Sequence, residues 1–200
     1  AGPFACRVLG ELGARVVKFE SAKGGDPVRS WPPPYLGGTP APFQALNRGK
    51  ESIALDFKAP DDRDLLHRLI GQADVFIQNL APGAAARAGF GSAELRKKHP
   101  RLITCDISGY GDSGPYRDMR AYDLLVQAES GLCEVTGTPD GPGRVGVSVC
   151  DIACGMASHA AILEALYHRE RSGEGRAINA SLFAGMADWM NVPYLQEVYG

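Results

Sequence analysis

The chain has 200 residues, of which 44% are hydrophobic and 22% are charged, as in an ordinary globular protein. Its 21 Lys and Arg residues against 23 Asp and Glu residues give a net charge of −2, which argues against a nucleic-acid-binding protein. A local basic pocket for a phosphorylated ligand remains compatible with this charge. No apolar run comes close to the roughly 20 residues of a membrane span.

The five cysteines show no disulfide spacing, and the four histidines lie in no metal-binding motif. We therefore expect reduced thiols, a cytoplasmic protein and no metal site.

Helical and extended patterns alternate along the chain. Apolar residues at helical spacing predict helices over 4–13, 61–72, 83–88, 92–98, 121–131 and 152–171, and a final helix after residue 182. Apolar runs predict strands over 15–20, 52–57, 74–80, 101–107 and 176–182, with a short extended piece over 144–149. Ser92 is expected to cap the helix that starts there. This alternation predicts an α/β fold with a mainly parallel sheet flanked by helices.

Both ends of the chain predict that it is part of a longer protein. It opens on Ala1-Gly2-Pro3 without an initiator methionine, and its first element is a helix with no strand before it. It closes at Gly200 inside a predicted helix. Because a βα unit begins with a strand, we expect truncation at both ends, with the first strand missing.

A glycine-rich segment, 109–114, matches the pattern G-x-G-x-x-G and follows a predicted strand. A dinucleotide site also needs a helix that opens directly after the glycines, so that its N-terminus meets the pyrophosphate. The next residues, 115–120, are polar and lack helical periodicity. We therefore expect a turn here, and neither NAD nor FAD.

Asp151 lies between the extended piece and the longest predicted helix. One interpretation is an N-cap, in which the carboxylate accepts backbone N–H groups of the first turn. The other is functional, since a carboxylate kept ionised at a helix N-terminus is suited to act as a nucleophile or a base. The two interpretations are compatible.

Other polar and aromatic residues have plain structural explanations. Asp123 stands in the first turn of a predicted helix, one turn before Gln127, and complements the helix dipole. Trp31 and Trp189 are expected to be packing residues. Single basic residues in loops or at helix ends are expected to be solvated more often than phosphate-binding: Arg29, Arg48, Lys50, Arg87 and Arg120.

Collinear segments throughout the chain carry a resemblance to a known family. They are AGP (1–3), LGELGARVVKFE (9–20), GGDPVRSW (24–31), NRGKESIALDFK (47–58), ADVFIQNLAPGAAARAGFG (73–91), PRLITCDISGYGDSGPY (100–116), AYDLLVQAESG (121–131), VGVSVCDIACGM (145–156) and HRERSGEGRAINASLFAGM (168–186). Each segment alone is weak evidence for a family, but the occurrence of all of them in this order is specific. In these motifs the chain resembles the class III CoA-transferases, the family of formyl-CoA transferase, carnitine CoA-transferase and α-methylacyl-CoA racemase.

The resemblance implies a Rossmann-like large domain, a smaller second domain and an interlocked homodimer. Residues 1–182 would form the CoA-binding large domain without its first strand, and residues 183–200 a helix leading toward the second domain. The chains of this family are about twice as long, which agrees with the expected truncation.

The resemblance also implies site residues. The family's catalytic aspartate maps onto Asp151 in Cys150-Asp151-Ile152-Ala153-Cys154-Gly155-Met156, and its second acidic residue maps onto Asp123, preceded by Tyr122. The positions implied to bind coenzyme A are Leu55, Asn79, Leu80, Arg87, Ala88 and Arg120. Ser21 stands where a basic residue is usual, so Lys23 or Arg29 is a candidate for the adenine phosphate contact.

The implied function is transfer of CoA from an acyl-CoA to a carboxylic acid, through an anhydride and then a CoA thioester on Asp151. The implied partners are these two substrates and a second copy of the chain, with no nucleic acid and no membrane. The first alternative is an acyl-CoA racemase, which would need a base where Tyr122 stands. The second is a CoA-binding subunit without activity of its own. The identity of the acids stays open.

Overall fold

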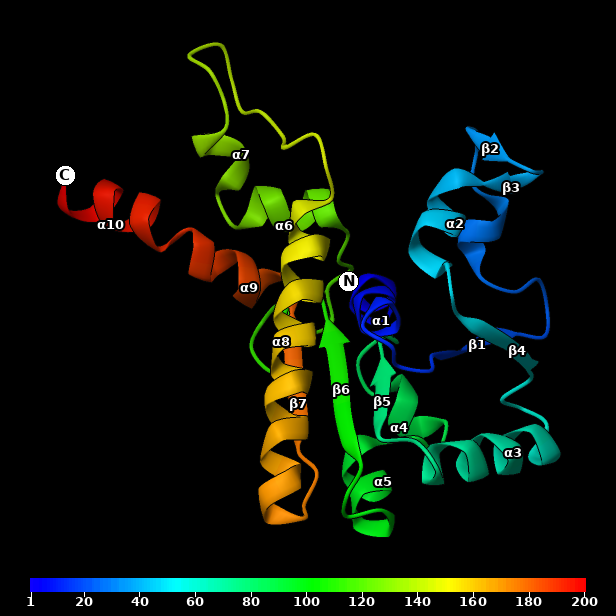
Figure 1. Ribbon diagram of the computed structural model, residues 1–200. Helices are drawn as coiled ribbons and strands as arrows, with labels where there is room; N and C mark the ends of the chain where they lie inside the picture. The colour runs from blue at the N-terminus through cyan, green and yellow to red at the C-terminus, as the bar shows by residue number, and fades with distance from the viewer. The chain divides into compact units, whose positions relative to one another are not determined.

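The computed structural model describes residues 1–200, which form two compact units (Figure 1). One unit is Pro3–Ala73, and the other is Ala1–Gly2 together with Asp74–Gly200. The predicted domain boundary after residue 182 stays a prediction.

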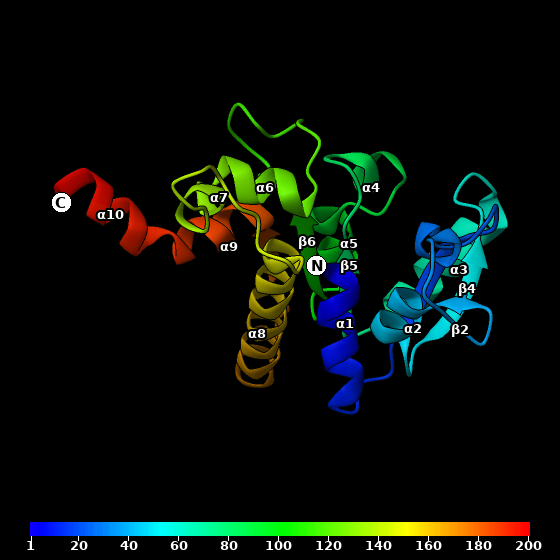
Figure 2. The same cartoon turned by 90° about the horizontal axis from the view of Figure 1, so that it is seen from above.

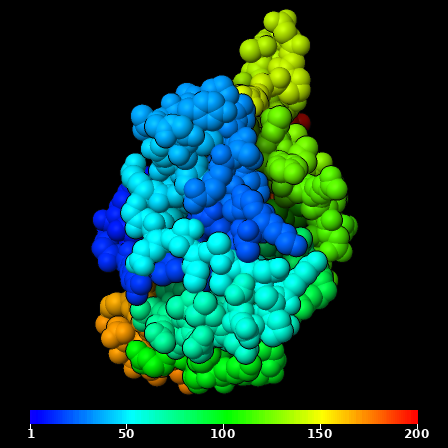
Figure 3. Space-filling view, turned by 90° about the vertical axis from the view of Figure 1, so that its right-hand side faces the viewer, coloured from blue at the N-terminus to red at the C-terminus, as the bar shows by residue number.

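The unit Pro3–Ala73 contains a two-stranded parallel sheet, a short hairpin and helices. Its elements are α1 (Gly2–Glu11), β1 (Val17–Ser21), the 3₁₀ helix η1 (Pro27–Ser30), β2 (Tyr35–Leu36), β3 (Thr39–Pro40), α2 (Ala41–Asn47), β4 (Glu51–Leu55) and α3 (Pro60–Gly71). Strands β1 and β4 pair in parallel, and β2 and β3 pair as a hairpin. Within this unit the hairpin and α2 lie at the opposite end from α3 (Figures 1 and 3).

A buried carboxylate ties the loop after β1 to the sheet. Glu20 has a side chain only 4% exposed, and it accepts two hydrogen bonds from the Arg29 guanidinium at 2.7 and 2.9 Å. It also accepts hydrogen bonds from the Ser52 hydroxyl and from the backbone N–H of Asp26. Arg29, a candidate phosphate contact, therefore already has its guanidinium engaged by Glu20.

Replacing Glu20 by glutamine is expected to change how stability depends on pH. The hydrogen bonds from Arg29 lower the pKa of Glu20 from 4.5 to about 2, against the opposing effect of burial. Since the pKa of the folded form is depressed, the stabilisation is present above pH 4.5 and is lost as pH falls toward 2. Thermal unfolding of the full-length protein should show the variant less stable at pH 7, with the difference shrinking between pH 5 and pH 3.

The matched control is Glu197→Gln on an exposed helix, which is expected to change stability by less than about 0.5 kcal/mol at either pH. A Glu20→Gln deficit of equal size at pH 7 and pH 3 would contradict the prediction.

The unit that includes Asp74–Gly200 is built on a three-stranded parallel sheet of order β5–β6–β7. Its elements are β5 (Val75–Gln78), α4 (Ala84–Arg87), α5 (Ser92–Lys98), β6 (Ile103–Ser108), α6 (Asp123–Glu129), α7 (Leu132–Val135), α8 (Val149–Ser172), β7 (Ala177–Ser181), α9 (Leu182–Trp189) and α10 (Asn191–Tyr199). Helix α8 packs against β6, β7, α6 and α9, while α5 packs against β6 from the other side of the sheet (Figures 1 and 2).

The core of this unit lies between β6 and the helices. Strand β6 is central, and its Ile103, Cys105 and Ile107 are at most 1% exposed. Ile162 of α8, a helix that packs against β6, and Met186 of α9, a helix that packs against α8 and β7, are fully buried as well. The predicted α/β fold with mainly parallel strands flanked by helices is confirmed, and most predicted elements agree to within a few residues.

Three local predictions are wrong. The expected extended piece 144–149 ends one residue too late, since Val149 already belongs to α8, and it pairs with no strand, since the Gln127 side chain binds the N–H of Val145. Ser92 does not cap α5: it is the first helical residue after the cap position Gly91, and its hydroxyl donates to Asp106. Trp31 and Trp189 are about half exposed rather than packed in the interior of this chain.

Helix α8 is longer and more apolar than the sequence pattern predicts. It has 24 residues, and an 18-residue window within it reaches a mean hydropathy of 1.4, enough by length and composition to cross a membrane. A core helix meets the same criteria. The contacts of α8 with β6, β7, α6 and α9 are those of a core helix within this fold.

Candidate active site

The first turns of two helices meet at one edge of the three-stranded sheet. Helix α8 runs antiparallel to β6, so its N-terminus lies at the carboxyl end of that strand, close to the N-terminus of the chain (Figure 1). The parallel strands β5 and β6 both end at this edge. The carboxyl edge of a parallel sheet is where ligands of α/β proteins bind.

Asp151 is the third residue of α8, which begins at Val149 rather than at the predicted residue 152. Its side chain is 37% exposed, and its Oδ1 lies 2.7 Å from the backbone nitrogen of Ala1. The cap position belongs to Ser148, whose side chain makes no capping hydrogen bond. The N-cap interpretation of Asp151 is therefore wrong, and its carboxylate accepts no N–H from its own first turn.

The carboxylate that caps α8 belongs to Asp123, the first residue of α6. Its Oδ1 accepts the backbone N–H of Cys150 at 2.8 Å and that of Asp151 at 3.0 Å. Its Oδ2 accepts a hydrogen bond from Gln127 Nε2 at 2.6 Å. Asp123 thus satisfies the orphan donors of a helix other than its own.

Gln127 is the residue whose role the sequence did not reveal. Its side chain is buried, with 1% exposure. Besides donating to Asp123, it accepts the backbone N–H of Val145 at 2.9 Å and donates to the carbonyl of Val147. The spacing of four residues from Asp123 on one helix face was the available signal, since such pairs are neighbours on a helix.

Tyr122 precedes α6 and is 70% exposed. Its backbone is extended, and its carbonyl accepts the N–H of Val126 in the first turn of α6. Tyr122 therefore lies next to Asp123 because the two residues are adjacent in sequence, and its ring is exposed to solvent.

Cys150 adjoins Asp151 but is not a competing nucleophile. Burial, together with the nearby charges of Asp123 and Asp151, raises the pKa of its thiol to about 12. Since the thiolate is the reactive form of cysteine, this thiol stays inert near neutral pH. No group of three or more His, Cys, Asp or Glu side chains in the chain is placed to hold a metal ion.

The residues implied to bind coenzyme A fall in different places. Asn79, directly after β5, donates to the carbonyl of Ile107, and Gly2 lies beside it, since a Cβ on Gly2 would be 3.8 Å from Asn79 Cβ. Leu80 is exposed next to it. The remaining positions are Arg87 at the end of α4, Ala88 after it, Arg120 in the exposed segment before α6, and Leu55, which is buried in the other unit.

Arg87 has a defined place over the turn before its helix. A Cβ added to Gly83 would lie 2.7 Å from Arg87 Nη1, and Gly83 has a φ of +73°. Glycine is the residue that tolerates both the positive φ and the close approach of the guanidinium.

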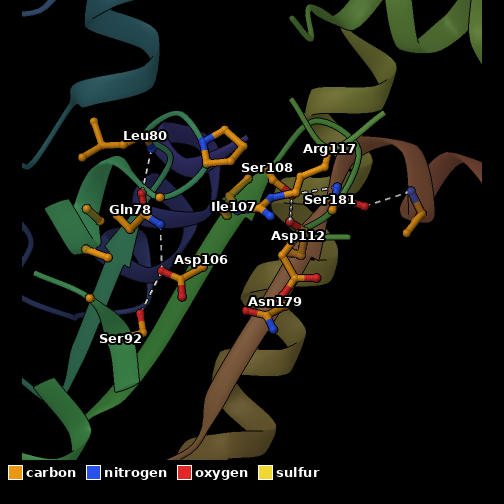
Figure 4. Close-up of a pocket in the computed structure, with 18 residues that line it drawn as sticks. Gln78, Leu80, Ser92, Asp106, Ile107, Ser108, Asp112, Arg117, Asn179 and Ser181 are labelled. Carbon is orange, nitrogen blue, oxygen red and sulfur yellow. Dashed lines mark hydrogen bonds between the residues drawn. The ribbon is translucent and has the colours of Figure 1, made fainter. Parts of the chain in front are cut away.

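A cavity of about 370 Å³ with both polar and apolar lining residues opens on the sheet face that carries α5 (Figure 4). Gln78, Asp106 and Asn179 are register neighbours on the three strands and line it in a row. Asp106 accepts hydrogen bonds from Gln78 and from Ser92, as Figure 4 shows. Leu80 lines the same cavity.

The glycine-rich loop closes another side of this cavity through Asp112 and Arg117. After the loop the next helix begins only at Asp123, so the segment is a turn, as predicted, and not a dinucleotide fingerprint. A Cβ on Gly109 would lie 2.0 Å from Ala121 Cβ, which explains the glycine at the end of β6.

Comparisons with known proteins agree with this architecture. A succinate–glutarate CoA-transferase of Agrobacterium fabrum is 43% identical over 189 residues, which cover 91% of this chain and 47% of that protein. An acetyl-CoA:oxalate CoA-transferase of Acetobacter aceti is 44% identical over 186 residues, covering 92% and 48%. The chain spans about half the length of the curated relatives it matches.

A crystal structure of a CaiB/BaiF family protein from Brucella suis superposes with a TM-score of 0.93 at 38% identity, over 98% of this chain and 53% of that one. The family model for CoA-transferase family III matches residues 1–200, the whole of the described chain. With the fold, the sequence motifs and this full-length match in agreement, the chain belongs to CoA-transferase family III.

Proposed function

We propose that the full-length protein transfers CoA from an acyl-CoA thioester to a carboxylic acid, with Asp151 as the nucleophile. The observation that supports this most is the placement of Asp151 in the first turn of α8. Its carboxylate is partly exposed, while the adjacent backbone N–H groups are bound by Asp123. Asp151 thus lies at the sheet edge with its Oδ1 bound to the Ala1 nitrogen and with its Oδ2 available to react.

The first half of the reaction releases one acid. A carboxylate oxygen of Asp151 attacks the thioester carbonyl, the C–S bond breaks, and an acyl-aspartyl anhydride and CoA thiolate form. The thiolate then attacks the aspartyl carbonyl of the anhydride, whose C–O bond breaks. The acid leaves as a carboxylate, and CoA remains as a thioester on Asp151.

The second half runs in reverse with the acceptor. The acceptor carboxylate attacks the aspartyl thioester and releases CoA thiolate, which gives a new anhydride. The thiolate then attacks the acceptor carbonyl and regenerates the Asp151 carboxylate. No net proton is taken up or released. Covalent catalysis suits this exchange because each step aligns only two reacting groups.

Coenzyme A is proposed to lie along the sheet edge next to Asp151. The proposed contacts of this unit are Asn79, Leu80, Arg87, Ala88 and Arg120, and the resemblance also implies Leu55 of the other unit as a contact. Arg87 and Arg120 would supply positive charge for the phosphates, which Arg binds well. A homodimer, interlocked as the resemblance implies, is part of the same proposal, as is a cytoplasmic location.

The racemase alternative has less support from the site. It needs a base beside Asp123, and the residue at that position is Tyr122, whose phenol accepts a proton less readily than the imidazole of a histidine. Both carboxylate oxygens of Asp123 also accept hydrogen bonds already. The second alternative, a CoA-binding subunit without activity, would have the same fold but would not catalyse CoA transfer.

The test uses the full-length protein and begins with the acids named for the two relatives. Succinyl-CoA or acetyl-CoA is offered as donor, glutarate and oxalate are offered as acceptors, and the products are identified by mass spectrometry. Hydroxylamine added during turnover should convert Asp151 to a hydroxamate, which peptide mapping locates. Modification elsewhere, or transfer with an unmodified Asp151, would contradict the proposal.

A second measurement separates the alternatives. In deuterium oxide without a carboxylic acid acceptor, a racemase would exchange the α-proton of the acyl group, and a transferase would leave it in place. Binding of CoA without turnover across a broad panel of donors and acids would favour the non-catalytic subunit.

A further inference from the structure

We propose that Asp123 and Gln127 form a positioning pair that orients Asp151, and that neither touches the substrate. This inference rests on the proposed nucleophilic role of Asp151. It assigns a function to Gln127, and it gives Asp123, the family's second acidic residue, the role of positioning Asp151.

The backbone N–H donors at the N-terminus of α8 are shared unequally between two carboxylates. Two carboxylates, Asp123 and Asp151, lie at this helix end, and both N–H groups of Cys150 and Asp151 point to Asp123. Hydrogen bonds from N–H donors stabilise the ionised form of a carboxylate and occupy its lone pairs. Asp123 therefore caps α8, and Oδ2 of Asp151 accepts no hydrogen bond from the backbone.

The Asp123 carboxylate that caps α8 also fixes the backbone of the nucleophile Asp151. The N–H of Asp151 is one of the two groups held by Asp123 Oδ1, at 3.0 Å. A hydrogen bond to the reacting residue's own backbone restricts where its Cα–Cβ bond points. Displacement of a reacting group by about 1 Å can lower a rate by about 10²-fold.

The Gln127 side chain in turn sets the orientation of the Asp123 carboxylate. The Oε1 of Gln127 accepts the N–H of Val145, so its amide nitrogen faces Asp123 Oδ2 and the carbonyl of Val147. This buried amide connects α6 to the segment that leads into α8. It therefore fixes both the carboxylate that caps α8 and the chain that enters it.

The pair allows a test by exchange of donor and acceptor. In Asp123→Asn the new amide nitrogen faces the Gln127 amide nitrogen, and in Gln127→Glu two carboxylates face each other. The double variant Asp123→Asn/Gln127→Glu restores a donor opposite an acceptor while Asn Oδ1 still accepts the two N–H groups of α8. The control is Glu129→Gln, an exposed position on the same helix.

The expected result in the full-length protein is a fall in kcat of about 10- to 100-fold for each single variant, with the KM for acyl-CoA changed less than threefold. On a logarithmic scale, the double variant should regain at least a third of the decrease in kcat that the single variants show. The control Glu129→Gln should have the wild-type kcat. The rate at which the acyl or CoA adduct appears on Asp151 in a single turnover should change in parallel with kcat.

The outcomes separate this inference from the proposed function. If the wild type forms no adduct on Asp151, the proposed function fails. If the wild type forms the adduct and the folded single variants form it at the wild-type rate, the positioning role is overturned. If a single variant does not fold, the double variant decides: unimpaired stability with no recovery of adduct formation would also overturn it.

Discussion

Replacing Asp151 by asparagine or alanine in the full-length protein is expected to lower the turnover number for CoA transfer by at least about 10³-fold. Asparagine keeps the shape of the side chain but cannot form an anhydride, and alanine excludes any recovery through deamidation. Because Asp151 is 37% exposed and forms no internal helix cap, the substitution should leave stability nearly unchanged. Steady-state transfer assays and thermal unfolding on the same samples provide the measurement.

The matched control for this prediction is Asp140→Asn, an exposed aspartate in the loop before α8. It should transfer CoA at the wild-type rate. Intact-mass spectra after incubation with acyl-CoA should show an adduct on wild type and on the control, and none on the Asp151 variants. Undiminished transfer by Asp151→Ala would refute the nucleophilic role.

Replacing Arg169 by methionine is expected to lower the free energy of unfolding by about 2–3 kcal/mol. The Arg169 side chain is only 8% exposed, and its Nη2 donates to the Asp74 carboxylate at 2.8 Å. Its Nη1 also donates to the backbone carbonyls of Asp74 and Arg101, at 3.5 and 3.3 Å. The Asp74 carboxylate is largely exposed, so water replaces the guanidinium when the ion pair is broken. The loss of stability therefore comes chiefly from the two backbone carbonyls that lose their hydrogen bonds to Arg169.

The control is Arg171→Met, two residues further along α8, where the guanidinium is exposed and lies 4.2 Å from the centre of the Tyr167 ring. It should change stability by less than about 0.5 kcal/mol. Urea unfolding of the full-length protein measures both variants. Equal effects of the two substitutions would mean that the buried hydrogen bonds of Arg169 contribute nothing beyond those of a surface arginine.

Periodic segments could be predicted from the sequence because their pattern is local. Helix α3 was expected over 61–72 and spans Pro60–Gly71, and the buried run that predicted a strand over 101–107 forms β6. The short elements α2, α7, β2 and β3 were missed, because two to seven residues carry too little periodicity to stand out.

The start of α8 could not be predicted, and the reason lies outside its own residues. Val149 begins the helix without a capping side chain at Ser148, and the cap comes from Asp123. A local pattern therefore pointed to Asp151 as the cap. The family resemblance singled out Asp123 and Asp151, but nothing in it indicated that one carboxylate binds the backbone of the other, or that Gln127 binds Asp123.

Because the carboxylate that caps α8 comes from α6, the first turn of α8 gains it only after the two helices have docked. The hydrogen bond from the Asp151 N–H to Asp123 closes a loop of 28 residues in sequence. Isolated helices gain little stability before tertiary packing, and an uncapped first turn frays. During folding the proposed nucleophile would therefore be ordered late, so that a partly folded chain would display Asp151 without its reactive geometry.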